Sequence, residues 1–173
     1  MTKPSEPGPQ MSFPGVRVLH AAGAAIEVRN RRLPQQEILA ALERAVGPRG
    51  LVEIYRTEVL PIKTRRLQLL GRKCYAAILH TLLGYEVKAE VKRIQCPDLV
   101  TARYVKLFSE LGCRSVHLPY DPTVTARLIP EMEQSLERIR ASVREMFPQD
   151  RELQLYVTRY QFALIRAGLR RNT

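Results

Sequence analysis

The residues that come nearest to a catalytic pair in this chain are Glu90 and Lys92, which one residue separates. From Tyr85 to Lys92, apolar and charged side chains alternate strictly. This period of two predicts a strand with one buried and one solvated face, and it places Glu90 and Lys92 together on the solvated face. A carboxylate beside a lysine is one half of what metal-dependent phosphodiester cleavage requires.

The Glu-x-Lys string resembles half of the site of metal-dependent nucleases, and the strand–helix–strand context is similar to the restriction-endonuclease-like fold. A Mg²⁺ ion that clamps a phosphate needs a second carboxylate. No Asp occurs in the first 97 residues, so only Glu53, Glu58 or Glu86 could supply it. Alternating Glu and Lys is also typical of any solvated strand face. We therefore expect no catalytic residue, and we keep Glu90 and Lys92 as the less favoured, nuclease alternative.

The sequence contains little evidence for a metal site, a cofactor site or a catalytic nucleophile. Cys96, Cys113 and His117 lack the closely spaced ligand pairs of a metal site, so no metal is expected. The chain has no G-x-S-x-G, Walker or G-x-G-x-x-G motif, and no cofactor is expected. Three cysteines without a close pair predict reduced, mostly buried thiols of an intracellular protein.

Positive charge is the strongest functional signal. The net charge is +11, the 28 basic residues include 22 Arg, and residues 63–93 hold eight basic residues against two acidic ones. Arginine is well suited to phosphate and to stacking on bases, and Tyr55, Tyr75 and Tyr85 could also stack if exposed. The sequence thus predicts a non-catalytic protein that binds nucleic acid, RNA or DNA, or is associated with nucleoprotein. The expected contacts are the clustered basic residues Arg29, Arg31, Arg32, Lys63, Arg65, Arg66, Arg72, Lys73, Lys88, Lys92 and Arg93.

The same charge could serve a protein-interaction or assembly factor with an acidic partner. In that case, the apolar periods of residues 123–147 and 150–168 offer an interface for the partner or for a homodimer. No RRM, KH or recognition-helix signature is present, so sequence-specific readout is not expected.

The positions of these residues depend on the expected elements. Residues 64–83 carry apolar side chains in steps of three and four, which predicts a helix ended by Gly84. Its first half is basic, and this opposes the helix dipole. Such a departure from helix preferences can mark function. The other expected elements are strands at 16–20, 24–28, 51–60, 85–92 and 115–118, and helices at 34–47, 98–111, 122–147 and 150–168.

This order predicts an α/β fold, with α+β as an alternative, built as a two-layer sandwich of one small mixed sheet with helices mainly on one face. We expect a disordered, proline-rich tail over residues 1–14, a single domain over 15–147, and a C-terminal helix with a basic end over 148–173, packed on that domain. No apolar run is long enough for a membrane span. The N-terminus lacks a secretory signal, so a cytoplasmic location is expected.

Overall fold

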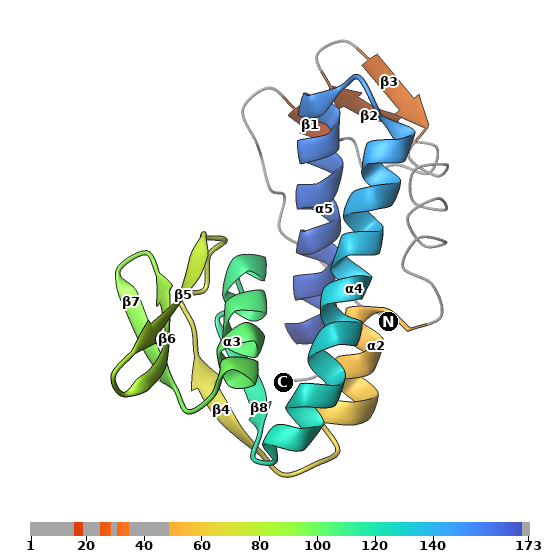
Figure 1. The fold of residues 1–173 in the computed structure, drawn as a ribbon. Coiled ribbons are helices and arrows are strands. Elements are labelled where there is room, and N and C mark those ends of the chain that lie inside the picture. Colours follow the sequence, from red (N-terminus) through yellow and green to blue (C-terminus); the bar gives the residue numbers. More distant parts are fainter. Residues whose placement is uncertain (1–15, 19–24, 29–30, 35–48, 171–173) are drawn as a thin grey trace, which may run out of the picture. The chain divides into compact units, whose positions relative to one another are not determined.

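The computed structural model describes residues 16–18, 25–28, 31–34 and 49–170 (Figure 1). The chain forms two compact units, Met1–Arg44 and Ala45–Thr173. The tail expected over 1–14 and nearly all of the helix expected over 34–47 lie outside the described residues. The division at residues 14 and 147 stays a prediction.

The first unit contains a three-stranded antiparallel sheet in the order β1-β2-β3. Val18 and Leu33 lie opposite Ile26 from its two sides. The hairpin expected from the sequence is confirmed, whereas Pro34 ends a strand and does not begin a helix. The strands are β1 (Val16–Val18), β2 (Ala25–Val28) and β3 (Arg31–Pro34).

The second unit begins with helix α2 (Leu51–Ile54), which continues as a π-helical turn η1 (Tyr55–Val59). The strand expected over 51–60 is therefore wrong. Leu51, Ile54, Tyr55 and Val59 are buried, at steps of three, one and four. These apolar residues follow a helical period, and this period outweighed the β-branched composition of the segment.

The helix expected over 64–83 is also wrong, because the segment forms two strands, and a third begins directly after it at Gly84. Gly71 lies between the first two with a φ of 82°, a left-handed conformation that interrupts a regular helix. Leu69, Cys74 and Ala76 are buried, but Leu82, which the helical period required inside, is fully exposed. The strands are β4 (Thr64–Gln68), β5 (Ala76–Thr81) and β6 (Gly84–Ala89).

The strands of the second unit form two small antiparallel sheets and not one mixed sheet. β4 pairs with β8 (Ser115–Pro119), and β5, β6 and β7 (Lys92–Cys96) form a meander. The mixture of helices and strands confirms the expected α/β class. The two-layer arrangement stays a prediction.

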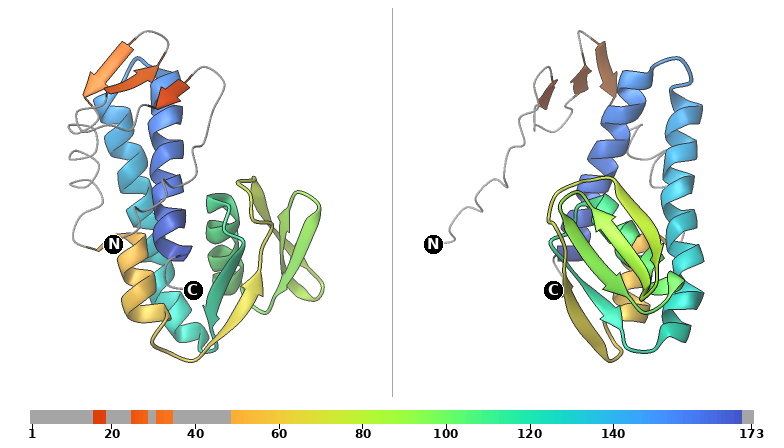
Figure 2. Two further views of the ribbon diagram at one scale, coloured as in Figure 1. Left: turned by 180° about the vertical axis from the view of Figure 1, so that it is seen from behind. Right: turned by 60° about the vertical axis from the view of Figure 1, so that its left-hand side comes forward.

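Helix α3 (Leu99–Leu111) confirms the sequence prediction at both ends. The Asp98 carboxylate accepts a hydrogen bond from the backbone N–H of Thr101 at 2.7 Å, and Gly112 follows the helix with a φ of 79°. The helix packs against the β5-β6-β7 sheet (Figure 2). One face of this sheet buries Ala76 and Val87, and the other carries the exposed Lys88.

Helices α4 (Pro122–Met146) and α5 (Arg151–Arg170) run antiparallel and side by side (Figure 1, Figure 2). Both helices were expected. The buried stripe of α5 continues from Val157 through Gln161 and Ile165, so the expected core residue Leu164 is 44% exposed. None of the helices within the described ranges is long and apolar enough to cross a membrane.

Candidate anion-binding site

Strand β8 anchors the candidate site, because it is held along both edges. β4 pairs with one edge. On the other, the Tyr55 hydroxyl accepts a hydrogen bond from the His117 N–H at 2.8 Å, and the Tyr104 hydroxyl donates one to the His117 carbonyl at 2.7 Å. Burial raises the pKa of Tyr104 well above its ordinary value, so the hydroxyl stays a donor. Tyr55 is 1% exposed, which excludes it as a base-stacking residue.

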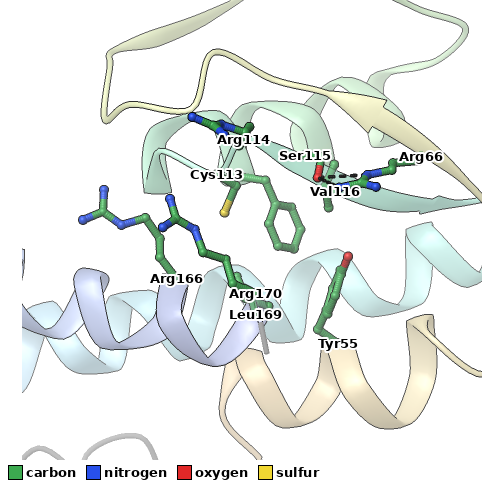
Figure 3. A pocket seen from close by; sticks show the side chains of 10 residues that line it. Tyr55, Arg66, Cys113, Arg114, Ser115, Val116, Arg166, Leu169 and Arg170 are labelled. Atoms are coloured by element: carbon green, nitrogen blue, oxygen red, sulfur yellow. Dashed lines mark hydrogen bonds between the residues drawn. The ribbon is translucent and has the colours of Figure 1, made fainter. Parts of the chain in front are cut away.

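A cavity of about 330 Å³ lies beside this strand, and Figure 3 shows it from close by. Its charged lining consists of four arginines, Arg66, Arg114, Arg166 and Arg170, which we call the arginine cavity. In Figure 3, Arg166 and Arg170 extend from α5 toward the segment that carries Cys113 and Arg114, while Arg66 enters from β4. The remaining described lining residues are Tyr55, Phe108, Cys113, Ser115, Val116 and Leu169, so no carboxylate of residues 49–170 lines the cavity.

The backbone around Gly112 fixes the loop that carries Cys113 and Arg114. The Cys113 N–H donates to the Phe108 carbonyl at the end of α3. The Cys113 and Arg114 carbonyls accept hydrogen bonds from the N–H groups of Gly71 and Leu69 at 3.0 and 2.8 Å. The left-handed conformation of Gly71 thus belongs to the loop beside β4 and not to the interior of the helix expected over 64–83.

Three of the four cavity arginines have no acidic partner among residues 49–170. Arg66 donates from Nε and Nη2 to the Ser115 Oγ at 3.2 and 3.1 Å. Within residues 49–170, Arg66, Arg114 and Arg166 form no ion pair with a carboxylate. By contrast, Arg127 on α4 pairs with Glu58 at 2.9 Å. The cavity therefore brings together three positive charges, on Arg66, Arg114 and Arg166, that the carboxylates of residues 49–170 leave unpaired.

Cys113 lines the cavity as a protonated thiol. Burial raises its pKa to about 11, and Arg166 and Arg170 only partly oppose this shift. A thiol with such a pKa is a poor nucleophile near neutral pH. Cys74, Cys96 and Cys113 are all buried and free of disulfides, which confirms the expected buried thiols.

A second group of cations adjoins the cavity along α5. Burial and the neighbouring Arg159, Arg140 and Arg166 lower the pKa of Lys73, although Glu110 opposes them. Lys73 and Arg140 each lie 5.5 Å from the centroid of the Phe162 ring. Arg166 and Arg170 lie seven and eleven positions after Arg159, so the three residues share one face of the helix. We call Lys73, Arg140, Arg159, Arg166 and Arg170 the basic stripe.

The structure separates most of the basic residues expected to bind nucleic acid. Arg66 lines the cavity and Lys73 belongs to the stripe. Arg65, next to Arg66, projects to the other face of β4, where its charge acts on the Cys96 thiol. The remaining expected residues lie elsewhere: Lys63 over the Tyr120 ring, Arg72 paired with Glu90, Lys88 exposed on β6, Lys92 bonded to the Gln68 carbonyl, Arg93 paired with Glu86, Arg31 and Arg32 in β3, and Arg29 outside the described residues.

The placement of Glu90 and Lys92 on one strand face is wrong. Glu90 lies in the turn between β6 and β7 with a φ of 52°, and its carboxylate pairs with Arg72. Lys92 begins β7 and donates from Nζ to the Gln68 carbonyl at 2.7 Å. Across the part of the chain that the structure describes, no three His, Cys, Asp or Glu side chains cluster as metal ligands would.

Sequence reasoning missed Arg114, and it treated Arg166 and Arg170 as a basic end without placing them in the site. One signal was present, because Arg159, Arg166 and Arg170 have the spacing of a single helix face. The meeting of this face with Arg66 and Arg114 depends on the pairing of β4 with β8 and on the packing of α5.

Comparison of the chain with protein-family models, with curated proteins and with solved structures finds no match.

Proposed function

We propose that this chain binds nucleic acid, without catalysis, through the arginine cavity and the basic stripe. The observation that carries the proposal is that Arg66, Arg114, Arg166 and Arg170 line one cavity to which residues 49–170 contribute no carboxylate. Arginine presents a planar fork of donors that matches phosphate oxygens, and it keeps its charge at any physiological pH.

The basic stripe favours a chain of phosphates over a single small anion. Burial lowers the pKa of Lys73 most, and the neighbouring Arg159, Arg140 and Arg166 lower it further, so like charges repel one another there. A bound polyanion would relieve this repulsion. Arg159 and Arg170 are eleven residues apart on α5, which corresponds to about 16 Å along the helix axis. A polymer with repeated charges can contact this whole length, whereas one phosphate cannot.

The expected alternative, an acidic protein partner, would use the same charges. The apolar residues Met132 and Ile139 of α4 and Leu153 and Val157 of α5 are buried inside the second unit. A homodimer through these two helices would therefore have to use other side chains. Homodimerisation, an acidic partner and a cytoplasmic location stay predictions.

The test is fluorescence anisotropy with labelled single- and double-stranded DNA and RNA, titrated between about 50 and 300 mM salt. Binding to phosphates releases counterions, so affinity should fall steeply with salt but persist at about 150 mM. The four ligands together identify the preferred nucleic acid. Affinity that disappears by about 150 mM for all four would reject the proposal and direct the search to acidic proteins.

Arg65 and Arg66 provide a matched pair for locating the interface. They are adjacent and exposed, but only Arg66 reaches the arginine cavity. Arg66→Glu should weaken binding much more than Arg65→Glu, although both change the net charge equally. Equal effects of the two variants would mean that overall charge, and not the cavity, determines binding.

A further inference from the structure

The arginine cavity differs from an open nucleic-acid groove because it has an apolar wall. Tyr55, Phe108 and Val116 are nearly fully buried and line it together with Leu169. A volume of about 330 Å³ lies at the lower end of the range for small-molecule sites. A terminal phosphate carries a bulky substituent on one side only, whereas a phosphate in mid-strand carries one on each side, so a small cavity accommodates the end of a strand more easily.

The charge of the cavity also exceeds what one phosphodiester requires. A terminal phosphomonoester carries about −1.5 to −2 charges near pH 7 and three acceptor oxygens. A phosphodiester carries a single charge. Arg66, Arg114 and Arg166 line the cavity with three guanidinium groups that have no acidic partner among residues 49–170. Three such charges in the lining of one cavity suit the doubly charged group.

Ser115 adds a neutral donor. Its Oγ accepts both hydrogen bonds from Arg66, so the hydroxyl proton is available to a ligand oxygen. The same contact holds the Arg66 guanidinium across β4 and β8 before any ligand arrives. Preorganised donors lower the entropic cost of binding.

We propose that the arginine cavity binds the terminal phosphomonoester of a nucleic-acid strand, and that the adjoining nucleotides continue along the basic stripe. This inference rests on the proposed function and adds a preference for strand ends to it. Arg166 belongs to both the cavity and the stripe, which connects the terminal phosphate to the phosphates that follow.

The experiment compares labelled oligonucleotides of one sequence that carry a 5′-phosphate, a 3′-phosphate or hydroxyls at both ends. At about 150 mM salt, one of the phosphorylated forms should bind about 10-fold more tightly than the hydroxyl form, because charge-assisted hydrogen bonds are added. The preference should shrink between pH 7 and pH 5, since the second pKa of a phosphomonoester is about 6. Arg166→Gln and Arg114→Gln should remove the preference, whereas Arg65→Gln should keep it; thermal melts confirm that each variant is folded.

Equal affinity for the three oligonucleotides would overturn end recognition and leave the proposed function intact. Absence of binding to all three at this salt would overturn both. Competition experiments distinguish a strand end from other ligands that carry a phosphomonoester. A free mononucleotide or a phosphoserine peptide that competes as well as the phosphorylated strand would overturn the assignment to a strand end, while competition only at far higher concentrations would support it.

Discussion

The hydroxyl of Tyr55 accepts a hydrogen bond from the backbone N–H of His117, 62 residues further along the chain. Tyr104 binds the carbonyl of the same residue, so two side chains from η1 and α3 satisfy one edge of β8. Unpaired buried backbone groups are costly. These tyrosines therefore fix the strand that carries Ser115 at the arginine cavity.

Tyr104→Phe should destabilise the protein, because it leaves the His117 carbonyl without its partner in a buried place. The expected loss in the free energy of unfolding is about 1–3 kcal/mol, measured by urea denaturation. Tyr75→Phe is the matched control, since Tyr75 is 81% exposed. Its effect should stay within about 0.5 kcal/mol. Similar losses in both variants would contradict the role given to the Tyr104 hydroxyl.

Gly112→Ala should be among the most damaging single-atom additions. A Cβ at this position would lie 2.5 Å from the Lys73 backbone N, and φ is 79°. The left-handed conformation alone costs about 1–2 kcal/mol, and the clash adds to it. Gly168→Ala is the control: its added Cβ would lie nearest to the Val52 side chain, at 3.1 Å, and its helical position gains propensity. Denaturation should show a much larger loss for Gly112→Ala, and an equal loss would contradict the packing described.

Alkaline pH should destabilise the fold through its buried thiols. Burial raises the pKa of Cys96 and of Cys113 from 9.0 to about 11. The unfolded chain loses these protons first, so the stabilisation is complete below about pH 9 and is lost as pH rises toward about 11. Urea denaturation at several pH values under reducing conditions measures this slope. It should be shallower in Cys113→Ala, and an unchanged slope would show that this thiol does not contribute.

Part of this fold follows directly from local sequence. Asp98 and Gly112 delimit α3 because their capping chemistry involves only neighbouring residues. The helix prediction for residues 64–83 failed because the apolar residues have helical spacing, while their burial is set by strand pairing, which for β4 involves residues about 50 positions away. The basic residues at the start of this segment conflicted with a helix dipole, and this conflict was evidence against the helix.

The candidate site was less predictable than the fold for the same reason. Charge density along the sequence indicated residues 63–93, but Arg72 and Arg93 find carboxylates once β6 and β7 form a hairpin. Arg114 and Arg166 gain importance only because β8 and α5 place them beside Arg66. A count of charges along the chain cannot tell a paired arginine from an unpaired one.

This distinction can be tested with two double variants that each remove two positive charges. Arg114→Gln with Arg166→Gln alters the arginine cavity, whereas Lys88→Gln with Arg93→Gln alters the open face of the β5-β6-β7 sheet, where Arg93 is paired with Glu86 at 3.0 Å. The cavity variant should lower the salt dependence of DNA binding, the slope of log affinity against log salt, by about 1.8, because two phosphate contacts are lost. The sheet variant should leave the slope nearly unchanged. Anisotropy titrations of both variants across the same salt series provide the measurement. A larger change in the sheet variant would show that the nucleic acid binds the open sheet face, which charge density along the sequence suggested, and not the arginine cavity.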